Sequence, residues 1–147
     1  MVEDIIKEKT SADHLLYVSL KYTKTCDVIL NLIARWQSMI ETSFDKLINK
    51  GVADGKIPSQ PISPKQKIEF MKKYFKKYPA IQETIPLYIF FKRIPSLEKK
   101  RQGDFRKNVT LKVTQGSKVV EINLDKLQEY AGVLERFISE VKQLISK

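Results

Sequence analysis

The chain has little cysteine, histidine or glycine, and these scarcities exclude several kinds of site. Its 147 residues include one cysteine, Cys26, and one histidine, His14. A lone cysteine forms no internal disulfide and no cysteine-based zinc site. The five glycines are isolated from one another, so the Rossmann and Walker spacings of phosphate-binding loops do not occur. We interpret Cys26 as a small buried apolar residue and His14 as a half-buried polar residue near a helix start.

Signatures of catalysis are missing as well. With one histidine and one cysteine, no catalytic triad and no metal cluster can be read from spacing, and no carboxylate pair stands out. We therefore expect a protein that is not an enzyme and that carries no cofactor and no metal.

Long apolar runs are also absent. The longest, such as residues 87–91, fall far short of the roughly 20 apolar residues of a membrane-spanning helix. The first residues are acidic where a signal peptide would be basic. We expect a cytoplasmic protein with no membrane partner. Because 42% of the residues are hydrophobic, the chain can bury a core without metals or disulfides, and we predict one helical domain over residues 1–147.

Apolar residues spaced three and four apart predict helices in the first third of the chain. Thr10 or Ser11 is expected to cap a helix that continues to about Tyr22. Thr25 is then expected to cap a long helix that Gly51 ends. The break between these helices is weak, so the sequence leaves open whether they form one bent helix.

Proline and glycine mark the middle of the chain. Two of each between residues 51 and 62 predict an internal loop. A capping box at Ser63, followed by Pro64 at the first helical position, begins a third helix that Pro79 is expected to end. The apolar stretch 80–93 predicts a buried segment that Pro86 would kink or begin.

Beyond Phe105 the apolar residues alternate, which predicts a β-hairpin over residues 105–124 with its turn around Gly116. Asp125 is expected to cap a last helix with a broad apolar face over residues 127–145. The fold class that we predict is mainly α: an antiparallel helical bundle with one β-hairpin before the C-terminal helix.

Positive charge is concentrated in one part of this sequence. The net charge is +10, and residues 65–107 hold thirteen basic residues against four acidic ones, an excess of +9. Eight of the fourteen aromatic residues lie in the same segment, and cations interleaved with aromatic rings are typical of surfaces that bind single strands. We predict a nucleic-acid or other polyanion site in this segment. Its residues are Lys65, Lys72, Lys73, Lys76, Lys77, Lys92, Arg93, Lys99, Lys100, Arg101, Arg106 and Lys107.

The geometry of this site depends on how the segment folds. Lys65, Lys72 and Lys76 fall on one side of the third predicted helix and form a ridge. If the run 99–101 docks beside that ridge, about six cations would face a phosphate backbone. An alternative interpretation is that the cations are a solvated face and that the apolar C-terminal helix makes the chain a protein interaction module, forming a homodimer.

The order of the predicted elements is similar to that of two groups of helical proteins. The helical layout resembles nucleases of the HEPN class, in which an arginine precedes a histidine by four to six residues, but no arginine precedes His14, so that activity does not transfer. The string from Ala12 to Val18, followed by a long helix, a hairpin and a final helix, resembles uncharacterised small helical proteins of thermophilic archaea. That resemblance implies a helical fold with a hairpin and supplies no activity.

Overall fold

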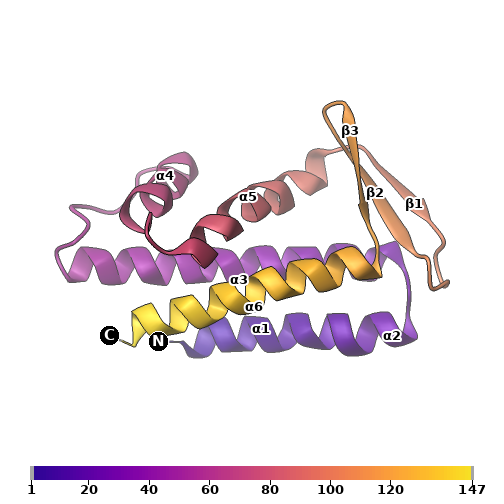
Figure 1. Ribbon diagram of the computed structural model, residues 1–147, viewed down its shortest axis with the longest axis horizontal. Helices are drawn as coiled ribbons and strands as arrows, with labels where there is room; N and C mark the ends of the chain where they lie inside the picture. The colour runs from indigo at the N-terminus through magenta and orange to yellow at the C-terminus, as the bar shows by residue number, and fades with distance from the viewer. Residues whose placement is uncertain (1, 147) are drawn as a thin grey trace.

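The computed structural model describes residues 2–146 and shows a mainly helical protein with a small antiparallel sheet before its C-terminal helix (Figure 1). The helical elements are α1 (Glu3–His14), a π-helical segment (Leu15–Ser19), α2 (Leu20–Tyr22), α3 (Cys26–Ala53), α4 (Pro64–Tyr74), α5 (Pro79–Arg93), a 3-10 turn (Ile94–Ser96) and α6 (Leu124–Ile145). The strands are β1 (Lys99–Gln102), β2 (Thr110–Gln115) and β3 (Lys118–Ile122).

The N-terminal helix begins earlier than the sequence suggested. It starts at Glu3 and runs through the π-helical segment to Tyr22, so the predicted cap at Thr10 or Ser11 is wrong. Residues 3–11 are mostly polar and give a weak helical pattern, but their few buried side chains, such as Ile5, pack the helix against α3. Thr23 leaves the helical conformation and ends this helix.

The long helix α3 is central, and α1, α4, α5 and α6 all pack against it. The side-chain oxygen of Thr25 accepts a hydrogen bond from the Val28 N–H at 3.3 Å, which confirms the predicted cap. Gly51 does not end the helix. It lies inside the last turns, where Ile57 packs so closely that an added Cβ would lie 2.6 Å from the Ile57 side chain. The loop therefore starts after Ala53 rather than at residue 51.

The start of α4 is as predicted. The Gln66 N–H donates to Ser63 Oγ at 3.1 Å, and Gln66 Oε1 accepts from the Ile62 N–H at 2.7 Å. The helix ends at Tyr74, however, and Pro79 takes the first position of α5 instead of ending α4. Proline suits that position because the first N–H of a helix has no partner within the helix.

The sheet has three strands in the order β1-β2-β3, whereas the sequence predicted a hairpin of two strands. β2 and β3 form the hairpin around Gly116, whose φ is +64°. β1 pairs antiparallel with β2, with Lys99 opposite Val113 and Gln102 opposite Thr110. The polar sequence of β1 has no apolar alternation and so gave no strand signal. Residues 105–109, predicted as strand, form the β1–β2 loop instead.

Helix α6 is capped by Asn123 rather than Asp125. Asn123 Oδ1 accepts a hydrogen bond from the Lys126 N–H at 2.8 Å, and Asp125 lies one residue inside the helix, in its first turn. The inner face of α6 is buried against the rest of the chain through Leu127, Leu134, Phe137, Ile138, Val141 and Ile145.

Candidate nucleic-acid interface

The densest group of cations lies on α4 and the turn that follows it. Met71 and Phe75 are buried on the inner side of this segment. Five exposed lysines lie on the same segment, and we call them together the α4 face: Lys65, Lys72, Lys73, Lys76 and Lys77. Within the part of the chain that the structure describes, none of the five forms an ion pair with a carboxylate. Their charges are therefore free to attract an anion.

A shallow groove of about 740 Å³ separates α4 from α5. One wall carries Lys72, Lys73 and Lys76, and Glu69 is the acidic residue of its lining. The apolar part of the lining comes from α5 through Ile85, Pro86 and Ile89. The groove thus joins a cationic wall to an apolar surface, which suits an anionic chain that also carries flat apolar groups.

The position of α4 against α5 is set by Gln82. Its side-chain N–H groups donate to the backbone oxygens of Met71 at 3.1 Å and of Phe75 at 2.8 Å. Met71 lies in the last turn of α4, where carbonyls lack partners within the helix, and Phe75 follows the helix, where its oxygen also accepts the Tyr78 N–H at 3.1 Å. A single glutamine of α5 therefore links this helix to the C-terminal end of α4 beside the groove.

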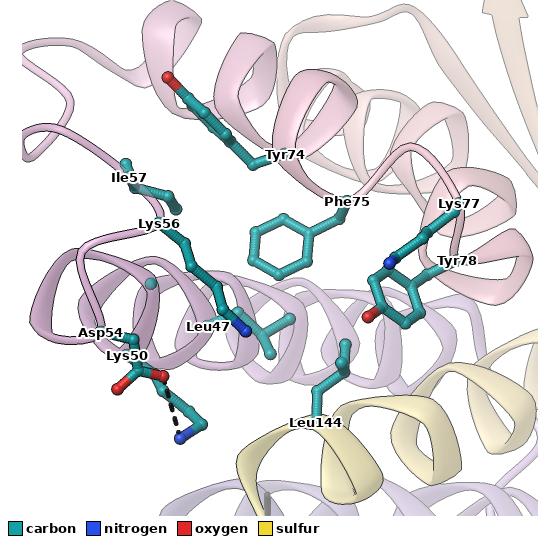
Figure 2. A pocket seen from close by; sticks show the side chains of 11 residues that line it. Leu47, Lys50, Asp54, Lys56, Ile57, Tyr74, Phe75, Lys77, Tyr78 and Leu144 are labelled. Atoms are coloured by element: carbon teal, nitrogen blue, oxygen red, sulfur yellow. Dashed lines mark ion pairs between the residues drawn. The ribbon is translucent and has the colours of Figure 1, made fainter.

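A separate pocket of about 260 Å³ lies where α3, α6 and the end of the α4 segment meet. Figure 2 shows that Leu47, Phe75 and Leu144 supply its apolar surface, while the ammonium ends of Lys56 and Lys77 lie around it. Asp54 also lines the pocket, but it pairs with Lys50 at 3.3 Å, so two cations are left over. The pocket therefore has the chemistry to hold a small apolar group with a negative charge at its end.

The run 99–101 does not dock beside the α4 face. Figure 1 places α4 and the sheet at opposite ends of the long axis, so the single patch that the sequence left open does not form. The reason is strand pairing, because β1 adds to the edge of β2 and carries these residues with it. Lys99 has a structural role there. Its Nζ donates to the backbone oxygens of Ile94, Pro95 and Leu97, at 2.9, 3.2 and 2.9 Å.

The remaining predicted cations lie at the C-terminal end of α5, on β1 and in the β1–β2 loop. Lys92 and Arg93 are exposed in the last turn of α5. Arg101 forms an ion pair with Asp27 at 2.6 Å. This contact raises the pKa of the Arg101 guanidinium and lowers the pKa of the Asp27 carboxyl, in both cases chiefly through the hydrogen bond between them.

Near Arg101, three more cations of the predicted set are exposed and unpaired among residues 2–146: Lys100, Arg106 and Lys107.

The structure also brings in residues that the sequence did not indicate. The connection between α2 and α3 is tied to the β1–β2 loop by two hydrogen bonds, Phe105 N–H to the Lys24 oxygen at 2.6 Å and Cys26 N–H to Asp104 Oδ1 at 3.0 Å. Lys21, Tyr22 and Lys24 therefore lie on a segment that packs beside the β1–β2 loop. We call this region the loop end and define it by Lys21, Tyr22, Lys24, Phe105, Arg106 and Lys107. About 80 residues of chain separate its two halves, so no local pattern could have joined them.

Comparison with known proteins gives no family for the chain. No protein-family model matches it, no curated protein matches it, and no solved structure matches it. The resemblance to small archaeal proteins therefore stays a prediction.

The described residues contain neither a cluster of metal-binding side chains nor a helix able to span a membrane. Residues 2–146 contain no group of three or more histidine, cysteine, aspartate or glutamate side chains placed to hold a metal ion. Over the same residues, no helix combines the length and the apolar character that crossing a membrane requires.

Proposed function

We propose that this chain is a non-enzymatic nucleic-acid-binding protein that contacts the phosphate backbone through the α4 face. The observation that carries the proposal is the set of five exposed lysines without carboxylate partners, three of them on the wall of the α4–α5 groove. Lysines that already pair with carboxylates gain little from a phosphate, whereas unpaired ones release counterions when they bind it.

The strength of this contact should depend steeply on salt. If the groove lysines Lys72, Lys73 and Lys76 each neutralise one phosphate, the slope of log affinity against log salt is about −3 for duplex DNA and about −2 for a single strand. Contacts from Lys65 and Lys77 would make the slope steeper. A face that is only solvated would bind weakly and give no defined slope.

The test is charge reversal with a matched control. One variant carries Lys72→Glu, Lys73→Glu and Lys76→Glu. The control carries the same change at three exposed lysines elsewhere that form no ion pair within residues 2–146: Lys7, Lys118 and Lys142. Both variants have the same net charge, so a difference between them reports position. We expect the groove variant to lose at least about tenfold in affinity for a labelled oligonucleotide at low salt and to give a shallower salt slope.

The control should keep most of the affinity. Equal losses in the two variants would show that only net charge matters, and no binding by the unaltered protein at low salt would end the proposal. Thermal melting checks that both variants fold, as expected for exposed lysines.

A second candidate function is the binding of a small apolar anion in the pocket of Figure 2. It is favoured by the position of Lys56 and Lys77 around an apolar cavity of about 260 Å³. Octanoate should then bind, octylamine should not, and Lys56→Gln with Lys77→Gln should abolish the preference. Equal behaviour of the two amphiphiles in calorimetry would count against a site for anions.

A further inference from the structure

Two aromatic side chains stand out at the loop end because they are almost fully exposed. Tyr22 is 78% exposed and Phe105 is 77% exposed, more than any other aromatic side chain among residues 2–146. A single exposed apolar side chain on a protein surface needs no explanation. Two aromatic rings on adjoining segments call for a reason.

The two segments that carry these rings are held together by a backbone hydrogen bond. The Phe105 N–H donates to the oxygen of Lys24, two residues beyond Tyr22, at 2.6 Å. Standard backbone dimensions then keep the Cα atoms of Tyr22 and Phe105 within about 14 Å of each other. The two rings therefore project from backbone positions that a short stretch of one nucleic-acid strand can span.

The conformation of Phe105 adds an independent observation. Its φ is +69°, in the left-handed region that bulky side chains rarely adopt, and it is the one residue other than glycine with positive φ in the described chain. The loop around it is closed by hydrogen bonds from Arg106 N–H to the Gly103 oxygen at 2.9 Å and from Val109 N–H to the Arg106 oxygen at 3.0 Å. A strained backbone that presents an exposed ring is typical of a functional position.

Positive charge surrounds the rings. Lys21 Nζ lies 5.8 Å from the centre of the Tyr22 ring, and Arg106 and Lys107 follow Phe105 directly. Of the carboxylates on these segments, Asp27 pairs with Arg101, and Asp104, which accepts the Cys26 N–H, is outnumbered by the cations of the loop end. The field at the loop end therefore favours an anion.

We propose that the loop end binds single-stranded nucleic acid, with bases stacked on Tyr22 and Phe105 and phosphates held by Lys21, Arg106 and Lys107. Stacking needs the open face of a base, which a single strand offers and a duplex covers. This proposal rests on the proposed function, because both assume that the ligand is a nucleic acid. It involves none of the α4 lysines, so an experiment can contradict the loop-end site without contradicting the α4 face.

The experiment compares a labelled oligothymidine with a duplex of the same length. Tyr22→Ala with Phe105→Ala should weaken oligothymidine binding by at least about fivefold for each ring removed and leave duplex binding unchanged. The matched control, Tyr22→Phe with Phe105→Tyr, keeps both rings and should keep the affinity. Thermal melting of both variants verifies the fold.

Each outcome separates the two sites. If the alanine variant binds oligothymidine as well as the unaltered protein, or if both ligands weaken equally, the stacking site is wrong. If the alanine variant loses the single strand while the groove variant with three glutamates does not, the loop end is the binding site and the α4 proposal fails. If the unaltered protein binds neither ligand, both proposals fail. Self-association that the alanine variant abolishes, without any oligothymidine binding, would assign the rings to contact between copies of the chain.

Discussion

Trp36 shows how much one side chain contributes to the core. It is 3% exposed, its ring stacks on Phe91 with centres 5.9 Å apart, and it packs nearly perpendicular to the Tyr130 ring with centres 6.4 Å apart. We expect blue-shifted fluorescence from the native protein, and we expect Trp36→Ala to lower the free energy of unfolding by about 3–5 kcal/mol, because it removes a large buried ring. Trp36→Phe should cost clearly less. Emission like that of free tryptophan from the folded chain would contradict the burial.

Tyr88 predicts how stability changes in alkali. Its hydroxyl donates to Glu41 Oε1 at 2.7 Å, and burial, followed by this contact with a carboxylate, raises the pKa of the phenol well above its usual range. Burial also raises the pKa of Tyr130 to about 12. Because the folded pKa values exceed the unfolded value of about 10, the folded chain keeps protons that the unfolded chain loses. The contribution is complete below pH 10 and is lost as pH rises towards 12 and beyond.

Urea unfolding measured from about pH 9 to pH 12 tests this expectation. The free energy of unfolding should fall with rising pH, and the fall should be shallower in Tyr88→Phe. At pH 8 that variant should be less stable by about 1–2 kcal/mol, because a hydrogen bond to a carboxylate is lost. Lysines titrate over the same range in both proteins, so the comparison is made at matched pH. Parallel curves would show that Tyr88 is not responsible.

Single residues were only partly predictable from the sequence. Trp36 lies four residues from both Leu32 and Ile40, and the apolar spacing alone places it inside. Cys26 is buried as expected, whereas His14, expected to be half-buried, is exposed. Spacing identifies a face within a strong amphipathic pattern, but His14 lies in a helix whose pattern is weak.

At the level of elements, the cap of α6 gives a direct test. Asn123→Ala should lower the free energy of unfolding by about 1 kcal/mol, because the Lys126 N–H loses its acceptor. Asn123→Asp keeps an acceptor and should be nearly neutral. Asp125→Ala should cost only a few tenths of a kcal/mol, since Asp125 interacts with the helix dipole without capping the helix. Urea unfolding ranks the three variants, and a larger loss from Asp125→Ala would contradict the assignment.

Elements that depend on residues within one turn of the chain were predicted from the sequence. Elements that depend on pairing with a distant segment were not. The start of α4 follows from Ser63, Pro64 and Gln66, which act within one turn. Strand β1 exists because its backbone pairs with β2 about ten residues later, and its own side chains give no sign of it. Pro79 was assigned to the end of one helix although it begins the next, because proline satisfies both rules.

On the scale of the whole molecule, charge that is concentrated in the sequence is not concentrated in space. The basic segment 65–107 contributes to α4, α5 and the sheet, which carry its cations to both ends of the long axis (Figure 1). The partner segment of the β1–β2 loop, residues 21–24, lies outside the basic segment altogether. Counting charge along the chain therefore indicated the kind of ligand to consider, and only the fold could show which cations are neighbours.

The state of association is the last property that the whole fold decides. The wide apolar face of α6 suggested a homodimer, but six of its residues are buried within the chain and the others are half-buried. α6 contributes none of the large apolar side chains that are exposed among residues 2–146. An apolar face already covered by α3 and α5 leaves little area for a second copy, and stable dimers bury on the order of 800 Å² on each partner.

We therefore expect light scattering at micromolar concentration to give the monomer mass of 17.1 kDa. A mass about twice as large would contradict this expectation. Two variants would then locate the interface: Leu144→Lys, which charges the half-buried end of α6, and Tyr17→Lys, which charges the exposed side of the N-terminal helix. Loss of the dimer in the first variant alone would restore the C-terminal helix as the interface. Loss in the second alone would place the interface on the N-terminal helix, where Ile6, Tyr17 and Val18 are exposed.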